Sequence, residues 1–308
     1  MQILIWSAVF IAGLVFLLFF SDRFVVSAEV IGLRLNVPSF VLGVLVLAVG
    51  TSLPELFTSV ISVLRGAPEI VSGTIIGSNI ANILLVLGAS ALFAGKKSVA
   101  FNLKHSDIVF FLASALIFIL VSSDGRITLP GGVILLLALA GYVGYVLTTN
   151  MPTVSDQPGE SLVQASIMLA VSILGVYAGS EMLVRSVVKL SVIAGIPSEI
   201  IAASAVAFGT SVPELAVSLA AARRGNIAMS VGNVVGSNIF NVLGVAGFAS
   251  LFGVITVEQV TLSLAVPVMA AATAAFAIVS FFKHTSRWQG ALFVLAYLAF
   301  CAKLYGLF

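Results

Sequence analysis

Two glutamates, Glu55 and Glu214, fall deep inside long apolar segments, whereas the other acidic residues lie near the ends of such segments or in loops. An ionised group at bilayer depth costs at least about 2.5–3.5 kcal/mol, so it normally faces a partner or a water-filled cavity. No Lys, Arg or His occurs at matching depth, because His105 and His284 both fall in loops. The two carboxyl groups are therefore either protonated, as neutral acids in a hydrogen-bonded core, or they hold cations.

A proline precedes each of these glutamates, at Pro54 and Pro213. Proline lacks an N–H and clashes with the carbonyl four residues earlier, which is that of Gly50 or Gly209. Main-chain carbonyls just before each glutamate can thus be released from helical bonding. At membrane depth, free carbonyls are tolerated where they line a cavity or bind an ion. The prolines favour the cation interpretation.

Other oxygen-bearing side chains recur near each glutamate at helical spacing. Thr51 and Ser52 precede Glu55 by one turn, and in the next apolar segment Ser78 and Asn82 are four residues apart. The same residue types surround Glu214, at Thr210, Ser211, Ser237 and Asn241. Such an all-oxygen set suits a hard cation such as Ca²⁺, whereas zinc and copper would require Cys or His. Two carboxylates could neutralise one Ca²⁺ or hold two or three Na⁺, and such loads would exclude one another.

The composition indicates which elements carry these residues. Of 308 residues, 60% are hydrophobic and only 8% are charged, which cannot cover a water-soluble surface. Apolar runs without alternation exclude an outer-membrane barrel, and a net charge of +2 spread over short loops gives no reason to expect a nucleic-acid partner. We therefore predict an all-α protein of the lipid bilayer with ten transmembrane helices, at roughly 3–20, 38–64, 70–94, 107–123, 128–148, 162–184, 197–222, 228–252, 258–282 and 288–306.

The chain repeats itself at a constant offset of 159 residues. Segment 48–59 matches 207–218, and 76–82 matches 235–241, with polar residues repeated as well as apolar ones. Five predicted helices separate the copies, so they would cross the membrane in opposite directions, as an inverted-topology repeat. We expect two five-helix repeats, 1–147 and 162–308, joined by a polar linker, 148–161.

Lys and Arg predict the sides of the membrane. Nine fall in the loops after the first, third, seventh and ninth helices, and five on the opposite side. The first group is expected to be cytoplasmic, which would leave both termini outside the plasma membrane. The first helix lacks a basic start and a cleavage site, so we interpret it as retained. Two repeat-equivalent acids near helix ends, Asp22 and Glu181, could be structural or could belong to an ion entrance.

At these motifs the chain resembles the cation/Ca²⁺ exchanger superfamily, and specifically its prokaryotic Na⁺/Ca²⁺ exchanger branch. GTSLPE at 50–55 and GTSVPE at 209–214, with GSNIAN at 77–82 and GSNIFN at 236–241, look like the two alpha-repeat signatures. The resemblance covers nearly the whole chain and implies a set of ion ligands. This set is Glu55, Glu214, Thr51, Ser52, Ser78, Thr210, Ser211 and Ser237, with the carbonyls of Ala48 and Ala207 at flanking Na⁺ positions and with Asn82 and Asn241 lining the middle position.

The resemblance implies a secondary active antiporter that exchanges about three Na⁺ for one Ca²⁺ through a shared site, electrogenically, while the first and sixth helices slide to switch access. Some relatives carry Asp at the position of Asn241, which weakens the case for K⁺ transport here and leaves open whether an ion or a water occupies that position. An exchanger driven by H⁺ or K⁺ and a passive cation channel remain as alternatives. An intramembrane hydrolase is excluded by the residue inventory, so we expect no enzyme, no cofactor and no obligatory protein partner.

Overall fold

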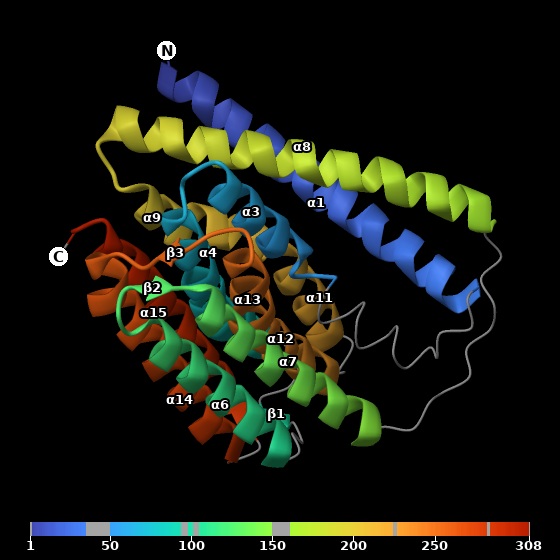
Figure 1. Cartoon of the computed structure of the whole chain (residues 1–308). Helices are drawn as coiled ribbons and strands as arrows, with labels where there is room; N and C mark the ends of the chain where they lie inside the picture. Colours follow the sequence, from blue (N-terminus) through green and yellow to red (C-terminus); the bar gives the residue numbers. More distant parts are fainter. Residues whose placement is uncertain are drawn as a thin grey trace.

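The computed structural model describes residues 2–34, 50–93, 98–100, 105–149, 161–223, 227–281 and 284–307. The chain is nearly all helical (Figure 1), and its π-helical segments carry the label η. The first half contains α1 (Gln2–Arg34), α3 (Leu53–Leu64), α4 (Glu69–Ile80), η2 (Ala81–Leu87), α5 (Gly88–Phe93), β1 (Ser98–Ala100), α6 (His105–Ser122), β2 (Arg126–Ile127) and α7 (Leu129–Thr149).

The second half contains α8 (Leu162–Ala194), α9 (Ser198–Ile201), η3 (Ala202–Val206), α10 (Ala207–Thr210), α11 (Val212–Arg223), α12 (Ile227–Ile239), η4 (Phe240–Val245), α13 (Ala246–Ser250), β3 (Ile255–Thr256), η5 (Thr261–Ala265), α14 (Val266–Phe281), β4 (His284–Ser286) and α15 (Arg287–Leu304). Two short antiparallel ribbons, β1 with β4 and β2 with β3, join loops that the sequence does not predict to pair.

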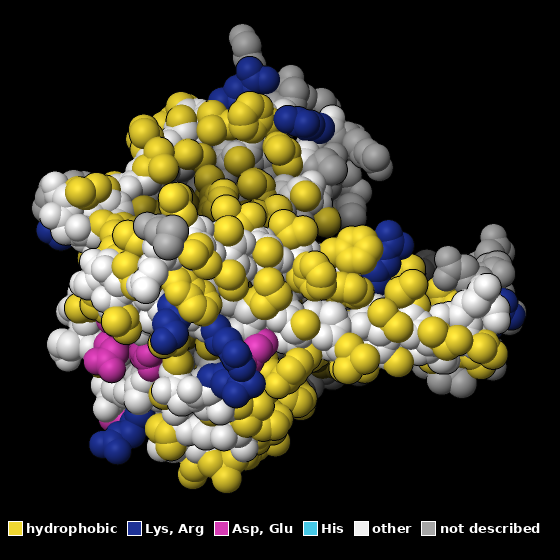
Figure 2. Space-filling model, turned by 90° about the horizontal axis from the view of Figure 1, so that it is seen from above, with side chains coloured by type: hydrophobic (Ala, Val, Ile, Leu, Met, Phe, Trp, Pro, Cys, Tyr) yellow, Lys and Arg dark blue, Asp and Glu magenta, His cyan; other side chains and the backbone are white. Residues whose placement is uncertain are grey.

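Within the described residues, seven helices are long and apolar enough to cross a membrane, and α3 and α6 are shorter apolar helices. The predicted class of a helical membrane protein agrees with this. The surface is largely hydrophobic, and Figure 2 shows charged side chains gathered in a few places on one face. A surface of this kind is expected where lipid tails replace water.

Two long helices, α1 and α8, lie side by side across the bundle (Figure 1). Each has 33 residues, so both helices continue beyond the predicted spans, which end near residues 20 and 184. Polar residues after position 20 do not break a helix, and the Arg23 guanidinium packs over the Phe19 ring. The later helix continues to Gly195, which has a φ of +66° that favours glycine and ends the helix.

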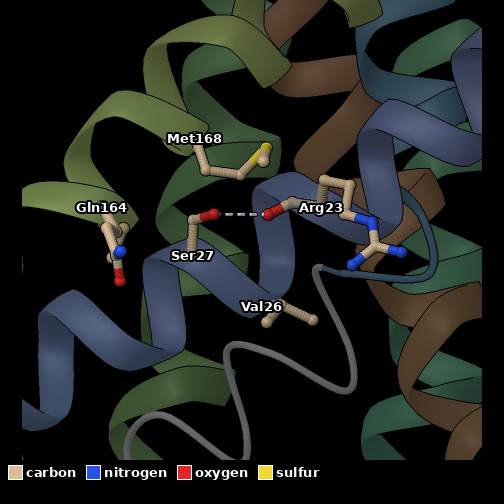
Figure 3. Close-up of a pocket in the computed structure, with 6 residues that line it drawn as sticks. Arg23, Val26, Ser27, Gln164 and Met168 are labelled. Carbon is tan, nitrogen blue, oxygen red and sulfur yellow. Dashed lines mark hydrogen bonds between the residues drawn. The ribbon is translucent and has the colours of Figure 1, made fainter. Parts of the chain in front are cut away.

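Glycines allow α1 and α8 to approach closely. A Cβ on Gly179 would lie 2.6 Å from the Leu17 nitrogen, and one on Gly13 would lie 2.9 Å from the Leu183 nitrogen. Farther along, a pocket of about 230 Å³ is lined by Arg23, Val26 and Ser27 of α1 and by Gln164, Ala165 and Met168 of α8, as Figure 3 shows. Low numbers in one helix therefore meet high numbers in the other, so the two helices run antiparallel.

The centre of the bundle is built by α4 with η2 and by α12 with η4, which are almost completely buried. Helix α4 packs against η3 through Gly77, where an added Cβ would lie 2.3 Å from the Ala203 carbonyl oxygen. This contact leaves no room for a side chain. It brings α4, which carries Ser78, against the segment that leads to Glu214.

Candidate cation site

Both buried glutamates occupy the first turn of a helix that starts after a break. Glu55 is the third residue of α3, and Glu214 is the third residue of α11. A proline in the first helical turn is tolerated because its missing N–H would have no helical partner there. The preceding residues leave the helix, since Ser52 precedes α3 and Ser211 separates α10 from α11. The helix N-terminus also favours a negative charge.

Hydroxyl groups from both halves of the chain surround the two carboxylates. The Ser78 hydroxyl donates to Glu55 Oε1 at 3.2 Å, and the Ser52 hydroxyl donates across the repeat to Glu214 Oε1 at 3.3 Å. Thr51 and Ser237 share a hydroxyl–hydroxyl bond of 3.1 Å, again between the halves. The two glutamates are close enough for their charges to interact. Each half therefore contributes to a single group of oxygens.

Several buried polar atoms in this group have no hydrogen-bond partner among the described residues. They are Oε2 of Glu55 and of Glu214, the Ser211 hydroxyl, and both amide atoms of Asn82 and of Asn241. Both glutamate side chains are fully buried, and within the described residues no ion pair joins either one to a basic group. A buried polar atom without a partner costs about 1–3 kcal/mol. A cation would satisfy these oxygens.

Other residues of the predicted ligand set are engaged with the backbone. Thr210 donates its hydroxyl to the Val206 carbonyl at 3.1 Å, although it also lies beside the Glu55 carboxylate. The Ala207 carbonyl accepts from the Ser211 N–H at 3.1 Å and from the Thr210 hydroxyl at 3.4 Å. Its oxygen is thus occupied within its own helix. Ala48, which is its repeat equivalent, lies outside the described residues.

The two asparagines of the predicted middle position begin wide helical turns. Asn82 is the second residue of η2, and Asn241 is the second residue of η4, so the π-helical segments recur at the repeat offset. A π-helical turn shifts the backbone hydrogen bonds by one residue and is frequent at functional sites. Both asparagines are fully buried. The segment η2, which carries Asn82, packs against α11, and η4, which carries Asn241, packs against α3.

Sequence reasoning missed a contact at the middle of this region. The Asn79 amide donates to the Asn238 carbonyl at 3.3 Å, and these residues are 159 apart. Residues that are equivalent in a repeat can touch only near the axis that relates the copies. The signal was present, because both residues follow the serine in the GSN motifs. Asn233, which donates to the Glu214 carbonyl at 3.4 Å, has no such signal because its counterpart is Thr74.

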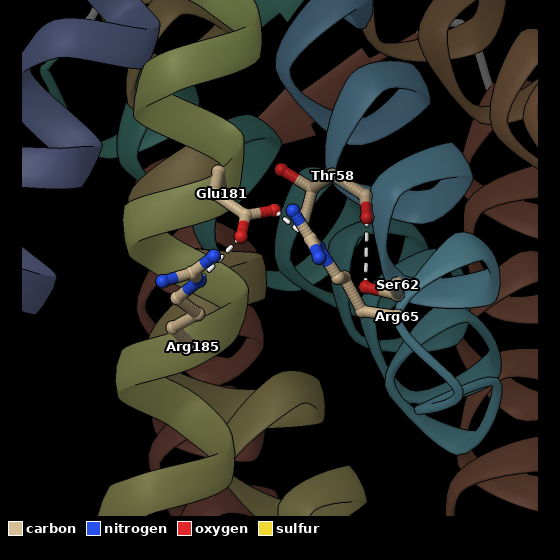
Figure 4. A network of polar contacts seen from close by, with 5 residues as sticks. All are labelled: Thr58, Ser62, Arg65, Glu181 and Arg185. Carbon is tan, nitrogen blue, oxygen red and sulfur yellow. Dashed lines mark hydrogen bonds and ion pairs between the residues drawn. The ribbon is translucent and has the colours of Figure 1, made fainter.

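Glu181, which the sequence left open between two roles, forms ion pairs with two arginines (Figure 4). Arg65, in the turn after α3, reaches its Oε2 at 2.7 Å, and Arg185 contacts Oε1 from one turn farther along α8. The carboxylate of Glu181 raises the pKa of the Arg65 guanidinium. Through this contact, α8 is tied to the helix that carries Glu55.

The family model described as sodium/calcium exchanger protein matches residues 5–148 and 165–306. An uncharacterised membrane protein of Methanocaldococcus jannaschii is 37% identical over 96% of both chains, and the sodium/calcium exchanger MaX1 of Methanosarcina acetivorans is 30% identical over 96% of this chain and 97% of its own. A structure of the sodium-calcium exchanger NCX_Mj, soaked with Na⁺ and Sr²⁺, superposes with a TM-score of 0.66 at 33% identity, over 96% of this chain and 98% of that one.

Proposed function

Because this chain belongs to the sodium/calcium exchanger family, we propose that it exchanges Na⁺ for Ca²⁺ across the membrane by alternating access at one shared site. The site is centred on Glu55 and Glu214. Its further ligands are the hydroxyl, amide and carbonyl oxygens of Thr51, Ser52, Ser78, Asn82, Ala48, Thr210, Ser211, Ser237, Asn241 and Ala207. The MaX1 relative and the NCX_Mj structure both carry the name of a sodium/calcium exchanger.

One observation carries this proposal. The carboxyl groups of Glu55 and Glu214 are fully buried, Ser52 of the Glu55 segment donates to Glu214, and each carboxyl group has one oxygen that has no partner among the described residues. Two ionised carboxylates side by side in a dry interior repel one another. One Ca²⁺ would neutralise both charges. Its distance to each oxygen ligand is flexible, at about 2.3–2.6 Å. Sodium ions have a similar size and would bind to the same oxygens. The Na⁺ ions must therefore leave before Ca²⁺ binds, and Ca²⁺ must leave before Na⁺ binds.

The same site can make transport electrogenic. If three Na⁺ replace one Ca²⁺, one net charge crosses the membrane in each cycle. The membrane potential then contributes about 2.3 kcal/mol per charge for each 100 mV. A site with two negative charges and several neutral oxygens can hold either three Na⁺ or one Ca²⁺.

An inverted repeat would supply both access pathways. The antiparallel packing of α1 and α8 and the contact of Asn79 with Asn238 support it, because both fit an axis in the membrane plane. In this arrangement, ten helices would cross the membrane and both termini would lie outside the plasma membrane. Helices α1 and α8 would slide against the central helices to switch access. The close contacts at Gly13 and Gly179 join α1 to α8, so the two helices would move together as one unit.

The test uses Glu55→Gln and Glu214→Gln in proteoliposomes. Each substitution keeps the size of the side chain but removes the charge that neutralises Ca²⁺, so Ca²⁺ uptake driven by a Na⁺ gradient should be lost. Asp107→Asn, which neutralises an acid in the first turn of α6, is the matched control and should transport normally. Full transport by both glutamine variants would refute the site.

Separate gradients distinguish the alternatives. Wild-type proteoliposomes are given Ca²⁺ with a Na⁺, a K⁺ or a pH gradient in turn. Uptake should require the Na⁺ gradient alone. Uptake driven by K⁺ or H⁺ would assign another coupling ion, and Ca²⁺ conduction without any counter-ion would identify a channel.

A further inference from the structure

Three acids outside the central site meet at one end of the bundle: Glu69, Glu199 and Glu258, here named the mouth cluster. Glu69 starts α4, Glu199 is the second residue of α9, and Glu258 follows β3. Close packing brings the first two together, because a Cβ on Gly73 would lie 2.6 Å from the Glu199 carbonyl oxygen. The Ser198 hydroxyl also donates to Glu69 Oε1 at 2.6 Å.

Glu199 is the unusual member of this cluster. Its side chain is buried, with 3% of the residue exposed, and its Oε2 atom has no hydrogen-bond partner among the described residues. The charges that act on it are those of Glu258 and Glu69, which have the same sign. A buried carboxylate facing two others is costly unless positive charge reaches it. Either a proton or a cation would relieve this cost.

We infer that the mouth cluster is an entry site for a hydrated divalent cation on its way to the central site. This inference deepens the proposed function and rests on it. No group of acids in the described part of the chain is arranged tightly enough to hold a bare metal ion, so the cation keeps water ligands and binds weakly. Two helical segments connect the cluster to the central site. Helix α4 extends from Glu69 to Ser78, which is about 13 Å at 1.5 Å per residue. The segments α9 to α11 extend from Glu199 to Glu214.

The repeat does not reproduce this cluster in the other half of the sequence. The repeat offset places Phe40, Ala228 and Val99 at the equivalent positions of the other half, and Lys96 and Lys97 lie close to Val99 in the sequence. The central ligands are repeated in both halves, so the central site is nearly symmetric. The mouth cluster is not repeated, so it should raise the local cation concentration on one face of the membrane.

Transport measured from each face tests this asymmetry. Right-side-out and inverted membrane vesicles carrying Glu199→Gln or Glu258→Gln are compared with wild type at low ionic strength. We expect the apparent KM for Ca²⁺ to rise about threefold to tenfold in one vesicle orientation only, because a charged mouth concentrates its ligand. The effect should shrink at about 0.5 M of an inert salt, which screens exposed charges. Asp107→Asn, which makes the same change in charge in the first turn of α6 and outside the cluster, should shift neither KM.

Direct binding gives the second measurement. Calorimetric titration with Ca²⁺ alone is performed on protein carrying both Glu55→Gln and Glu214→Gln, whose central site is neutral. A weak binding site should remain, and it should be lost when Glu199→Gln and Glu258→Gln are added. If Glu258→Gln, which alters an exposed side chain, left the KM at the wild-type value on both faces, the inference would be overturned. A wild-type protein without Na⁺-dependent Ca²⁺ uptake would instead overturn the proposed function.

Discussion

At the scale of single residues, the serine hydroxyls explain how two buried carboxyl groups can be stabilised inside a bilayer when no cation is bound. Ser78 donates to Glu55 and Ser52 donates to Glu214, so each carboxyl group accepts a hydrogen bond from a serine. A hydroxyl that donates its proton still has lone pairs to offer a cation. The same serine can thus support the carboxylate when the ion is absent and bind the ion when it arrives.

Ser78→Ala tests this double role. The substitution removes one hydroxyl but keeps both charges, so Na⁺-driven Ca²⁺ uptake should persist with an apparent KM raised about threefold to tenfold. The size follows from one hydrogen bond of about 0.5–1.5 kcal/mol, with 1.4 kcal/mol equal to a factor of ten. Ser90→Ala, another buried serine, serves as the control and should leave KM unchanged. Unchanged KM in the Ser78 variant would remove this residue from the ligand set.

At the scale of elements, the bundle depends on close contacts that only glycine permits. A Cβ at Gly77 would lie 2.3 Å from the Ala203 carbonyl oxygen and 2.7 Å from its Cα. Both partners are backbone atoms, so a larger residue must push α4 away from η3. Because α4 carries Ser78 and η3 leads to α10 and α11, the same shift would separate the two halves of the site.

We therefore expect Gly77→Ala to destabilise the protein by about 1–3 kcal/mol, the range seen for overpacking. Thermal unfolding of the purified protein measures this as a lower Tm. Gly144→Ala is the matched control, since this α7 glycine has nothing within 4 Å of an added Cβ. It should be neutral or slightly stabilising, because alanine is the better helix former. A Tm equal to wild type for Gly77→Ala would contradict the packing argument.

The contact between Arg65 and Glu181 joins the α3–α4 turn to α8, the helix that we propose to slide. The pair is partly exposed, with 44% of the Arg65 side chain and 12% of the Glu181 side chain accessible, so its contribution to folding stability should be below about 1 kcal/mol. The ion pair can still affect the rate at which α8 moves during transport. Arg65→Gln should change the initial rate of Ca²⁺ uptake by up to about fivefold. The reason is that the Arg65–Glu181 ion pair would stabilise one of the two access states relative to the other.

Arg185→Gln provides the comparison for that experiment. Arg185 contacts the same carboxylate, but both residues belong to α8, so their pair does not join two parts of the bundle. Its removal should leave the uptake rate close to wild type. If both variants slowed or accelerated transport equally, the effect would come from the charge of Glu181 and not from a tie between α8 and α3.

At the scale of the whole molecule, the repeat makes much of the site predictable. An identical Thr-Ser-x-Pro-Glu in each half points to two equivalent glutamates, and the structure places Glu55 and Glu214 together. The lengths of α1 and α8 were not predictable from hydropathy, because polar residues near their ends stay helical. Glu199 was also missed, because its burial depends on packing between α4 and α9 and leaves no pattern in the sequence.

The proposed coupling predicts how the whole protein responds to voltage. If each cycle moves one net charge, a potential of 100 mV contributes about 2.3 kcal/mol, and the steady-state Ca²⁺ gradient should change about 40-fold, since 1.4 kcal/mol is a factor of ten. Proteoliposomes with a fixed Na⁺ gradient and a potential set by K⁺ and valinomycin allow this measurement. Protein-free liposomes and the Glu55→Gln variant control for leak. A Ca²⁺ gradient independent of potential would mean that two Na⁺ balance each Ca²⁺, and the central site would then carry equal charge in both loaded states.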